Sequence, residues 1–209
     1  MARNLEPACK QCRRVGEKLF LKGEKCFTPK CPVVRRAYPP GMHGQQATSR
    51  LSKYGTQLRE KQKAKKMYGL MENQFRLYFA RAVAKPGNTG ELLLRMLEQR
   101  LDNVVYRLGF AKSRAAARQM VRHGHLTVNG QHVDIPSYQV QVQDVVAIAD
   151  AKKSKERYGD LVKELERHEL PDWLALDKTA LTGTVQTAPS VESLQQSIKA
   201  QLVVEFYSR

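Results

Sequence analysis

The clearest hydrophobic periodicity in this chain of 209 residues lies between residues 91 and 124. Apolar side chains recur there at steps of three and four residues, which places them on one face of a helix that Gly109 ends. They are Leu93, Leu97, Leu101, Val104, Val105 and Leu108. Ser113 is then placed to cap a second helix over residues 114–123, which Gly124 closes. The pattern predicts two successive helices, each with one buried face.

Beyond the second helix the pattern changes from helical spacing to alternation. Short apolar runs at 126–128 and 133–135 flank Asn129-Gly130, and an Asn-Gly pair in that setting is the strongest short signal for a β-hairpin. Valines continue through residues 139–149 and predict a further strand, with a turn near Asp144. Helices followed by strands predict a compact α+β module.

The stretch from Arg50 to Ala84 predicts helices as well. Residues 58–67 form a cationic helix, and the next helix carries an apolar stripe. The stripe consists of Leu70, Phe75, Leu77, Tyr78, Phe79 and Val83. Residues 85–90 break this helix, because Pro and Gly do not continue one and the Asn-Thr pair is suited to cap another.

All four cysteines lie in the first 31 residues, with the spacing C-x2-C-x13-C-x4-C. Four thiolates form a tetrahedral set that suits zinc and leaves no open position for water or substrate. We therefore expect one structural Zn2+ bound by Cys9, Cys12, Cys26 and Cys31, with His43 as a reserve ligand only. The alternatives are disulfides or free thiols. Against disulfides, the first residues lack the apolar core of a secretory signal, and oxidised frameworks are rare in reducing compartments.

Charge is strongly polarised along the chain. The formal net charge is +16, and Lys and Arg outnumber Asp and Glu by 17 to 4 in residues 1–66, by 10 to 7 in 67–150, and not at all in 151–209. Such an excess repels itself unless a polyanion neutralises it, so nucleic acid is the expected partner. An anionic membrane would also attract it, but no apolar run approaches the roughly 20 residues needed to span a bilayer. No lipidation motif is present either, so we expect no membrane association.

A second cationic feature lies on the helix predicted over residues 114–123. Arg114, Arg118 and Arg122 are four residues apart, so we expect their guanidinium groups to align opposite the face that packs. Guanidinium groups match phosphate oxygens, and the helix start beside Lys112 and Ser113 offers backbone N–H groups to an anion. The alternative is a solvated helix face, which most charge stripes are.

Motifs for catalysis are missing from the sequence. It has no Walker loop, no G-x-S-x-G and no H-E-x-x-H, and His168-Glu169 lacks a second histidine. Trp173 is expected to pack rather than to stack on a base, and His123 and His125 lie beside a helix end where polar residues are common. We expect a protein that is not an enzyme and has no small-molecule substrate.

Several motifs in addition to the cysteines carry a resemblance that covers essentially the whole chain. They are Tyr38-Pro-Pro-Gly-x-His-Gly44, Leu58-Arg-Glu-Lys-Gln-Lys63, Gln99-Arg-Leu-Asp-Asn-Val-Val-Tyr-Arg-Leu-Gly-Phe110, Ser113-Arg, Ala117-Arg-Gln119, Val128-Asn-Gly130, Pro136-Ser-Tyr138 and Val204-Glu-Phe-Tyr-Ser-Arg209. With them the sequence resembles the family of bacterial small-subunit ribosomal protein four (uS-four), in its zinc-binding four-cysteine form. Some relatives lack the cysteines, so the zinc prediction depends on the four cysteines of this chain.

The resemblance implies a structural constituent of the small ribosomal subunit, located in the cytoplasm on the ribosome. It implies a primary rRNA-binding protein that docks near a five-helix junction in the 5′ domain of small-subunit ribosomal RNA, nucleates assembly and contributes to translational accuracy. The implied neighbours are small-subunit ribosomal proteins three and five, and mRNA near the tunnel by which it reaches the subunit.

The implied fold class is α+β in three parts. Residues 1–45 are a zinc-held N-terminal appendage, and residues 46–90 are a basic helical domain that the C-terminal tail, 161–209, completes. Residues 91–160 are an inserted RNA-binding module of two helices followed by a small antiparallel sheet. The side chains expected to contact RNA are Arg13, Arg14, Lys30, Arg35, Arg36, Arg50, Lys53, Tyr54, Arg59, Lys61, Lys63, Lys65, Lys66, Lys112, Ser113, Arg114, Arg118, Arg122 and His123.

Two other classes of protein share some of these features. The helix-and-hairpin module also resembles one carried by RNA-modifying pseudouridine synthases and by tyrosyl-tRNA synthetases. Those enzymes need a large catalytic domain, and no stretch of that size remains outside residues 91–150. A zinc-bearing DNA-binding regulator would fit the cysteines and the charge, but it ordinarily shows a recognition helix in a dimeric or tandem-finger setting.

Overall fold

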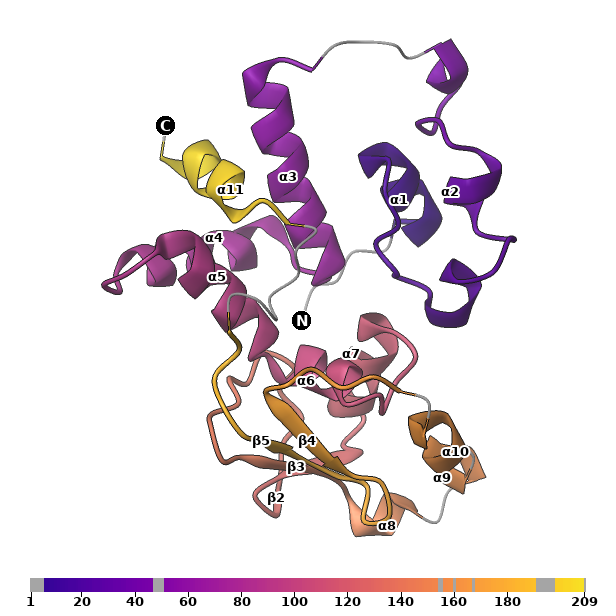
Figure 1. Ribbon diagram of the computed structural model, residues 1–209, viewed down its shortest axis with the longest axis vertical. Coiled ribbons are helices and arrows are strands. Elements are labelled where there is room, and N and C mark those ends of the chain that lie inside the picture. Colours follow the sequence, from indigo (N-terminus) through magenta and orange to yellow (C-terminus); the bar gives the residue numbers. More distant parts are fainter. Residues whose placement is uncertain are drawn as a thin grey trace. The chain divides into compact units, whose positions relative to one another are not determined.

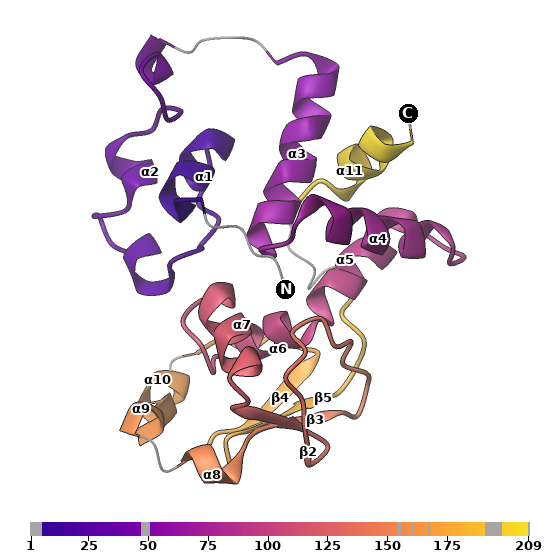
Figure 2. The same cartoon turned by 180° about the vertical axis from the view of Figure 1, so that it is seen from behind.

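The computed structural model describes residues 6–46, 51–153, 156–159, 161–166, 168–190 and 198–208. The chain divides into two compact units (Figure 1), unit 1 being Met1–Leu93 with Gln196–Arg209 and unit 2 being Leu94–Gln195. Helices dominate the described part of unit 1, whereas unit 2 combines helices with a sheet (Figure 2). Among the described residues, no helix has both the length and the apolar character needed to cross a membrane.

Unit 1 begins with short helical turns that contain the cysteines. In order they are α1 (Ala8–Val15), η1 (Gly23–Cys26), α2 (Pro32–Arg35) and η2 (Gly44–Gln46). Few large apolar side chains are buried here, notably Val15 and Leu19, so the packing of this segment is thin. We refer to residues 6–46 as the cysteine segment.

Three longer helices complete unit 1: α3 (Lys53–Met67), α4 (Glu72–Val83) and α11 (Ala200–Tyr207). The predicted cationic helix is confirmed and begins earlier, because Ser52 caps it by accepting a hydrogen bond from the N–H of Gly55 at 3.1 Å. α11 packs beside α3 in both views (Figures 1 and 2). The apolar stripe on α4 is only partly buried. Phe75 and Tyr78 lie in the core, but Leu77 and Val83 are 59% and 57% exposed, because only one face of α4 is covered.

The prediction of a single helix over residues 93–108 is wrong. The structure has two helices there, α5 (Thr89–Glu98) and α6 (Leu101–Arg107). Arg100 between them is extended and pairs with Gln139, while the N–H of Leu101 donates to the carbonyl of Tyr138 at 2.9 Å. These backbone bonds to a distant loop replace the helical ones. The six periodic apolar residues are all buried, so the pattern identified the buried face and not the break.

The capped helix and the hairpin are confirmed. α7 (Arg114–Arg122) begins at Ser113, whose hydroxyl accepts a hydrogen bond from the N–H of Ala116 at 3.2 Å. β1 (Leu126–Val128) pairs with β2 (Gln131–His132), which lies two residues before the strand expected at 133–135. Asn129 and Gly130 both have positive φ, 50° and 79°, as a tight hairpin turn of this kind requires.

Five antiparallel strands form one sheet in the order β2-β1-β3-β5-β4. β3 (Val145–Ile148) covers only part of the strand expected over 139–149, and β4 (Leu174–Asp177) and β5 (Thr182–Val185) were not expected at all. In the register Val146 faces Gly183, where a Cβ atom would lie 2.4 Å from carbons of Leu108. Glycine therefore allows β5 to approach α6 closely.

The C-terminal tail does not all complete the helical unit, as was expected for residues 161–209. Strands β4 and β5 join the sheet of unit 2, and only α11 packs on α3. Between β3 and β4 lie α8 (Asp150–Lys153), α9 (Glu156–Gly159) and α10 (Leu161–Glu166). β5 joins the sheet because β3 would otherwise leave one of its edges without hydrogen-bond partners, and β4 extends the sheet by pairing with β5.

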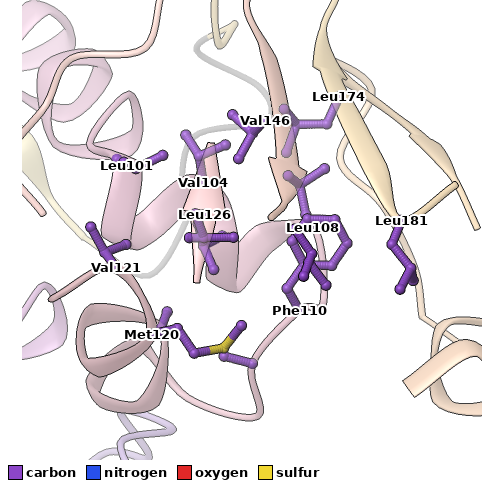
Figure 3. Close-up of a cluster of buried hydrophobic side chains, with 14 of the residues drawn as sticks. Leu101, Val104, Leu108, Phe110, Met120, Val121, Leu126, Val146, Leu174 and Leu181 are labelled. Atoms are coloured by element: carbon purple, nitrogen blue, oxygen red, sulfur yellow. The ribbon is translucent and has the colours of Figure 1, made fainter. Parts of the chain in front are cut away.

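The core of unit 2 lies between the sheet and helices α6 and α7 (Figure 3). The helices and strands contribute Leu101, Val104, Leu108, Met120, Val121, Leu126, Val146 and Leu174. Trp173 is buried in this core, which confirms its expected packing role. Because β4 and β5 supply part of the core, residues 91–160 alone would be an incomplete module.

Candidate nucleic-acid interface

The four cysteines line one small cavity of about 10 Å³ in the cysteine segment. Cys9 and Cys12 come from one turn of α1, Cys26 ends η1, and Cys31 immediately precedes α2. Three of the four thiols are buried, and all four are free. His43 does not line the cavity. The structure thus brings the four sulfur donors together in a space of about the size of one water molecule or ion.

The local electrostatics agree with this convergence. Burial raises the pKa of the Cys12 thiol, a hydrogen bond from the Leu19 backbone opposes this, and the nearby thiols of Cys26, Cys9 and Cys31 raise the pKa further. However, no three Cys, His, Asp or Glu side chains in the described part of the chain stand in the arrangement of a finished metal shell. Zinc coordination therefore stays a prediction.

Several cations that were expected to contact RNA are exposed on unit 1. Four belong to the cysteine segment and two to α3, which also carries Tyr54, itself half exposed. They are Arg14, Lys30, Arg35, Arg36, Lys53 and Arg59. These side chains are accessible to a phosphate backbone without any rearrangement of the fold.

Other expected RNA contacts on unit 1 are instead used inside the protein. The guanidinium of Arg13 donates to the carbonyls of Arg36, Tyr38 and Pro39 at 3.0–3.2 Å and lies 4.8 Å from the Tyr38 ring centre. Lys63 is buried, and its ammonium lies 2.6 Å from a carboxylate oxygen of Glu17. These two side chains hold the cysteine segment together and tie it to α3.

Lys61 and Lys65 also point inward, toward Glu72 at the start of α4. Their ammonium groups lie 2.8 and 2.9 Å from its two carboxylate oxygens, and the hydroxyl of Tyr207 on α11 donates to the same carboxylate at 2.8 Å. Lys61 also lies 4.8 Å from the Phe206 ring centre. Four lysines of this part of α3 were expected to contact RNA, and the fourth, Lys66, is half-buried. This partial burial lowers the pKa of Lys66. The contact network around Glu72 joins three helices.

This network predicts a pH dependence of stability. Partial burial alone would raise the pKa of Glu72, but the hydrogen bonds from Lys61, Lys65 and Tyr207 outweigh it and lower the pKa from 4.5 to about 2. A carboxylate whose pKa is lower in the folded than in the unfolded state stabilises the fold at pH values above its unfolded-state pKa. That stabilisation is lost as the pH falls through the folded-state pKa. We therefore expect Glu72→Gln to lower the free energy of unfolding at pH 7, and the difference from wild type to shrink between about pH 4.5 and pH 2.

At pH 7 the free energy of unfolding is expected to fall by about 1–3 kcal/mol, because the buried ammonium of Lys61 loses its charged partner. The carboxylate of Glu72 is partly exposed, so solvent screens the interaction and the decrease should lie near the lower end of this range. Denaturant unfolding at several pH values measures it. Glu169→Gln, which removes an exposed carboxylate, is the control. A constant difference between Glu72→Gln and wild type from pH 7 to pH 2 would contradict the assignment.

On unit 2 the three arginines of α7 do not form one outward stripe. Arg114 donates from Nε to the Asn103 side-chain oxygen at 2.7 Å and lies 4.6 Å from the Tyr106 ring centre. Arg118 lies 3.4 Å from a carboxylate oxygen of Asp102. Both arginines are half-buried against α6, whereas Arg122 is exposed. The expectation that all three lie opposite the packed face is therefore wrong, because α6 offers acidic and amide partners on that side.

Behind these contacts lies a buried polar network on α6 and the residues before it. Asp102 accepts two hydrogen bonds from Arg100 at 3.0 and 2.7 Å, and both side chains are buried. Glu98 accepts from Asn103 at 2.7 Å and from Arg107 at 2.9 and 3.0 Å. Removing one partner of such a network leaves a buried charge uncompensated. Asn103 and Asp102 of this network are the residues that Arg114 and Arg118 contact, so the network holds these two arginines against α6.

A prediction separates the exposed arginine from the packed ones. Arg122→Gln is expected to weaken RNA binding by severalfold and to lower the log–log salt slope by about one, with no change in thermal unfolding, because its side chain is exposed. Arg118→Gln is its matched control and is expected to lower thermal stability, because Asp102 loses a partner. Unchanged RNA affinity of Arg122→Gln would leave this residue as part of a solvated face.

The remaining expected contacts differ in accessibility. Lys112 is exposed and pairs with Glu164 at 2.7 Å, an exposed ion pair that contributes little to stability. Ser113 is used as the helix cap, and His123 is exposed at the end of α7. Arg50 lies outside the described residues.

Some accessible side chains were missed at the sequence level. Arg76 and Arg81 are exposed on α4, a helix for which only the apolar stripe was predicted from the sequence. Phe20 and Phe27 are exposed beside the cysteine cavity, and aromatic residues among lysines are the signal by which they were detectable.

Comparison with known proteins gives matches along most of the chain. The Ribosomal protein S4/S9 N-terminal domain matches residues 3–98, and the S4 domain matches residues 99–146. Small ribosomal subunit protein uS4 of Acidithiobacillus ferrooxidans is 54% identical over 209 residues, which are 100% of both chains. Proteins of the same name from Thiobacillus denitrificans, 54% identical, and Desulfitobacterium hafniense, 53% identical, also align over 209 residues and 100% of both chains. The boundary between the two matched domains falls where α5 ends and α6 is about to begin.

Proposed function

We propose that this chain, which belongs to the uS4 family of small ribosomal subunit proteins, is a structural constituent of that subunit and binds its ribosomal RNA. The observation that carries the proposal is the match over the full length of both chains at 54% identity. The exposed cations of unit 1, and Arg122 on unit 2, are the contacts that the fold offers to phosphates.

The rival classes are not favoured. An RNA-modifying or tRNA-charging enzyme needs a catalytic domain beside the helix-and-hairpin module, but the relatives have the same length as this chain and are ribosomal proteins by name. A DNA-binding regulator would present α7 as a recognition helix, yet two of its three arginines face α6. The protein is a structural, non-enzymatic member of its family.

A finer role follows from the resemblance to uS-four proteins. The chain would bind the 5′ domain of the ribosomal RNA early, nucleate assembly, lie beside small-subunit ribosomal proteins three and five and near mRNA, and contribute to translational accuracy. Two features support early binding. Both units bury apolar side chains of their own, and both present accessible cations.

We also propose that Cys9, Cys12, Cys26 and Cys31 bind one structural Zn2+. The donor set fits: four free thiols line one cavity. Four thiolates with one Zn2+ carry a net charge of −2, and Lys22 and Lys25, which line the same cavity, are suited to balance it. A bound ion would supply the segment with the cohesion that its few buried apolar side chains do not.

Reconstitution of the small subunit tests the proposed function. The purified chain is expected to bind small-subunit ribosomal RNA before any other ribosomal protein is added and to remain in the completed particle. Binding that requires other proteins to be present first would contradict the early role. Absence from the particle would contradict the proposed function as a whole.

A further inference from the structure

Two phenylalanine rings lie together on the surface of the cysteine segment. The ring centres of Phe20 and Phe27 are 5.1 Å apart, and the two side chains are 36% and 73% exposed. Exposing large aromatic rings to water is unfavourable. The pair therefore offers an exposed aromatic surface on which a binding partner could be buried.

The backbone holds both rings in this outward position. Phe20 has a φ of 51°, a left-handed conformation that is strained for an aromatic residue, and it lies between Leu19, which is buried, and Leu21, which lines the cysteine cavity. Phe27 directly follows Cys26, and its N–H donates to the carbonyl of Glu24 at 3.0 Å. The rings are fixed in place by the same segment that brings the cysteines together.

The charges around the pair favour a nucleic acid as its partner. Four exposed lysines lie within three positions along the chain of one ring or the other: Lys18, Lys22, Lys25 and Lys30. Lysine is depleted in the cores of protein–protein interfaces, so this surface is poorly suited to a protein. Aromatic rings beside cations are the usual arrangement for binding unpaired bases, where the ring stacks on the base and the cation binds the phosphate.

We propose that the Phe20–Phe27 pair stacks on an unpaired base of ribosomal RNA. The proposal rests on the proposed function and adds to it a contact that is not ionic. Lys18 and Lys30, which do not line the cysteine cavity, would bind neighbouring phosphates, while Phe27, the more exposed ring, would carry most of the stacking. Such a contact reads an unpaired base and not a duplex, so it locates this surface over a loop or bulge of the RNA.

The test compares variants of the full chain for binding to small-subunit ribosomal RNA across a salt series. Phe27→Leu is expected to lose about five- to a hundredfold in affinity with no change in the salt slope, because stacking releases no counterions. Lys30→Gln is expected to lower the slope by about one. Phe27→Trp is expected to keep the affinity, and its fluorescence is expected to be quenched when RNA binds, relative to wild type with only Trp173.

Val34→Ala is the matched control, since Val34 is a 56% exposed apolar residue of the same segment that carries no aromatic ring. Its affinity is expected to stay within about twofold of wild type. Thermal unfolding shows that each variant is folded. The proposal is overturned if Phe27→Leu binds as wild type does, if its salt slope falls, or if RNA leaves the fluorescence of Phe27→Trp unchanged. Failure of the wild-type chain to bind this RNA would contradict the proposed function instead.

Discussion

Replacing Cys9 and Cys26 with serine is expected to abolish metal binding and to unfold the cysteine segment. Zinc coordination contributes on the order of 10 kcal/mol in small zinc-held folds, and this segment buries too few apolar side chains to replace it. The rest of unit 1 and unit 2 have cores of their own and are expected to stay folded. Hydrogen exchange, resolved by peptide, should show loss of protection in residues 6–46 only.

Metal analysis under reducing conditions gives the direct readout for wild type and variant. Wild type is expected to contain one zinc per chain and the double variant none. Thr28→Ser, in the turn between Cys26 and Cys31, is the control and should retain the ion. Less than about half an equivalent in wild type, or full retention in the double variant, would rule out the four-cysteine site.

Raising the salt concentration is expected to weaken RNA binding more than any single substitution does. A protein with six to ten phosphate contacts loses about 10³–10⁵ in affinity between about 50 and 200 mM salt, because each contact releases counterions from the RNA. This chain exposes enough cations on unit 1 for a slope in that range. A salt series with a fixed ribosomal RNA fragment measures the slope.

The structure supplies a pair of variants that makes the salt series sharper. Arg35→Gln combined with Arg36→Gln removes two exposed cations and is expected to lower the slope by about two. Lys63→Gln removes one buried cation paired with Glu17, so it is expected to lower thermal stability and to leave the slope unchanged. A flat salt series for wild type would mean that the exposed cations are not at the interface.

Local patterns in the sequence predicted the elements that local interactions determine. Ser113 and Asn129-Gly130 were enough to locate a helix start and a hairpin turn, because a side-chain cap and a positive φ act within three residues. The break at Arg100 was missed because its cause is a bridge to Gln139. Strands β4 and β5 were missed because β5 pairs with β3, in which Val146 lies opposite Gly183, and β4 pairs only with β5. β5 also carries little apolar pattern of its own.

The same distinction explains the errors at the candidate interface. The lysines of α3 and the arginines of α7 formed regular cationic patterns, but the sequence pattern could not show which of them had carboxylate partners. Those of Lys61 and Lys63 are Glu72, eleven residues later, and Glu17, forty-six residues earlier. Charge counting therefore predicted the partner class, whereas the division into accessible and buried cations needed the fold.

Chemical footprinting of small-subunit ribosomal RNA by the purified chain distinguishes specific RNA recognition from general polyanion binding. A uS4 protein that recognises this RNA is expected to protect a defined region of the 5′ domain, at protein concentrations where duplex DNA does not compete. Equal protection along the whole RNA, or equal binding to duplex DNA of the same length, would show that the basic surface binds any polyanion, and the proposed function would be wrong.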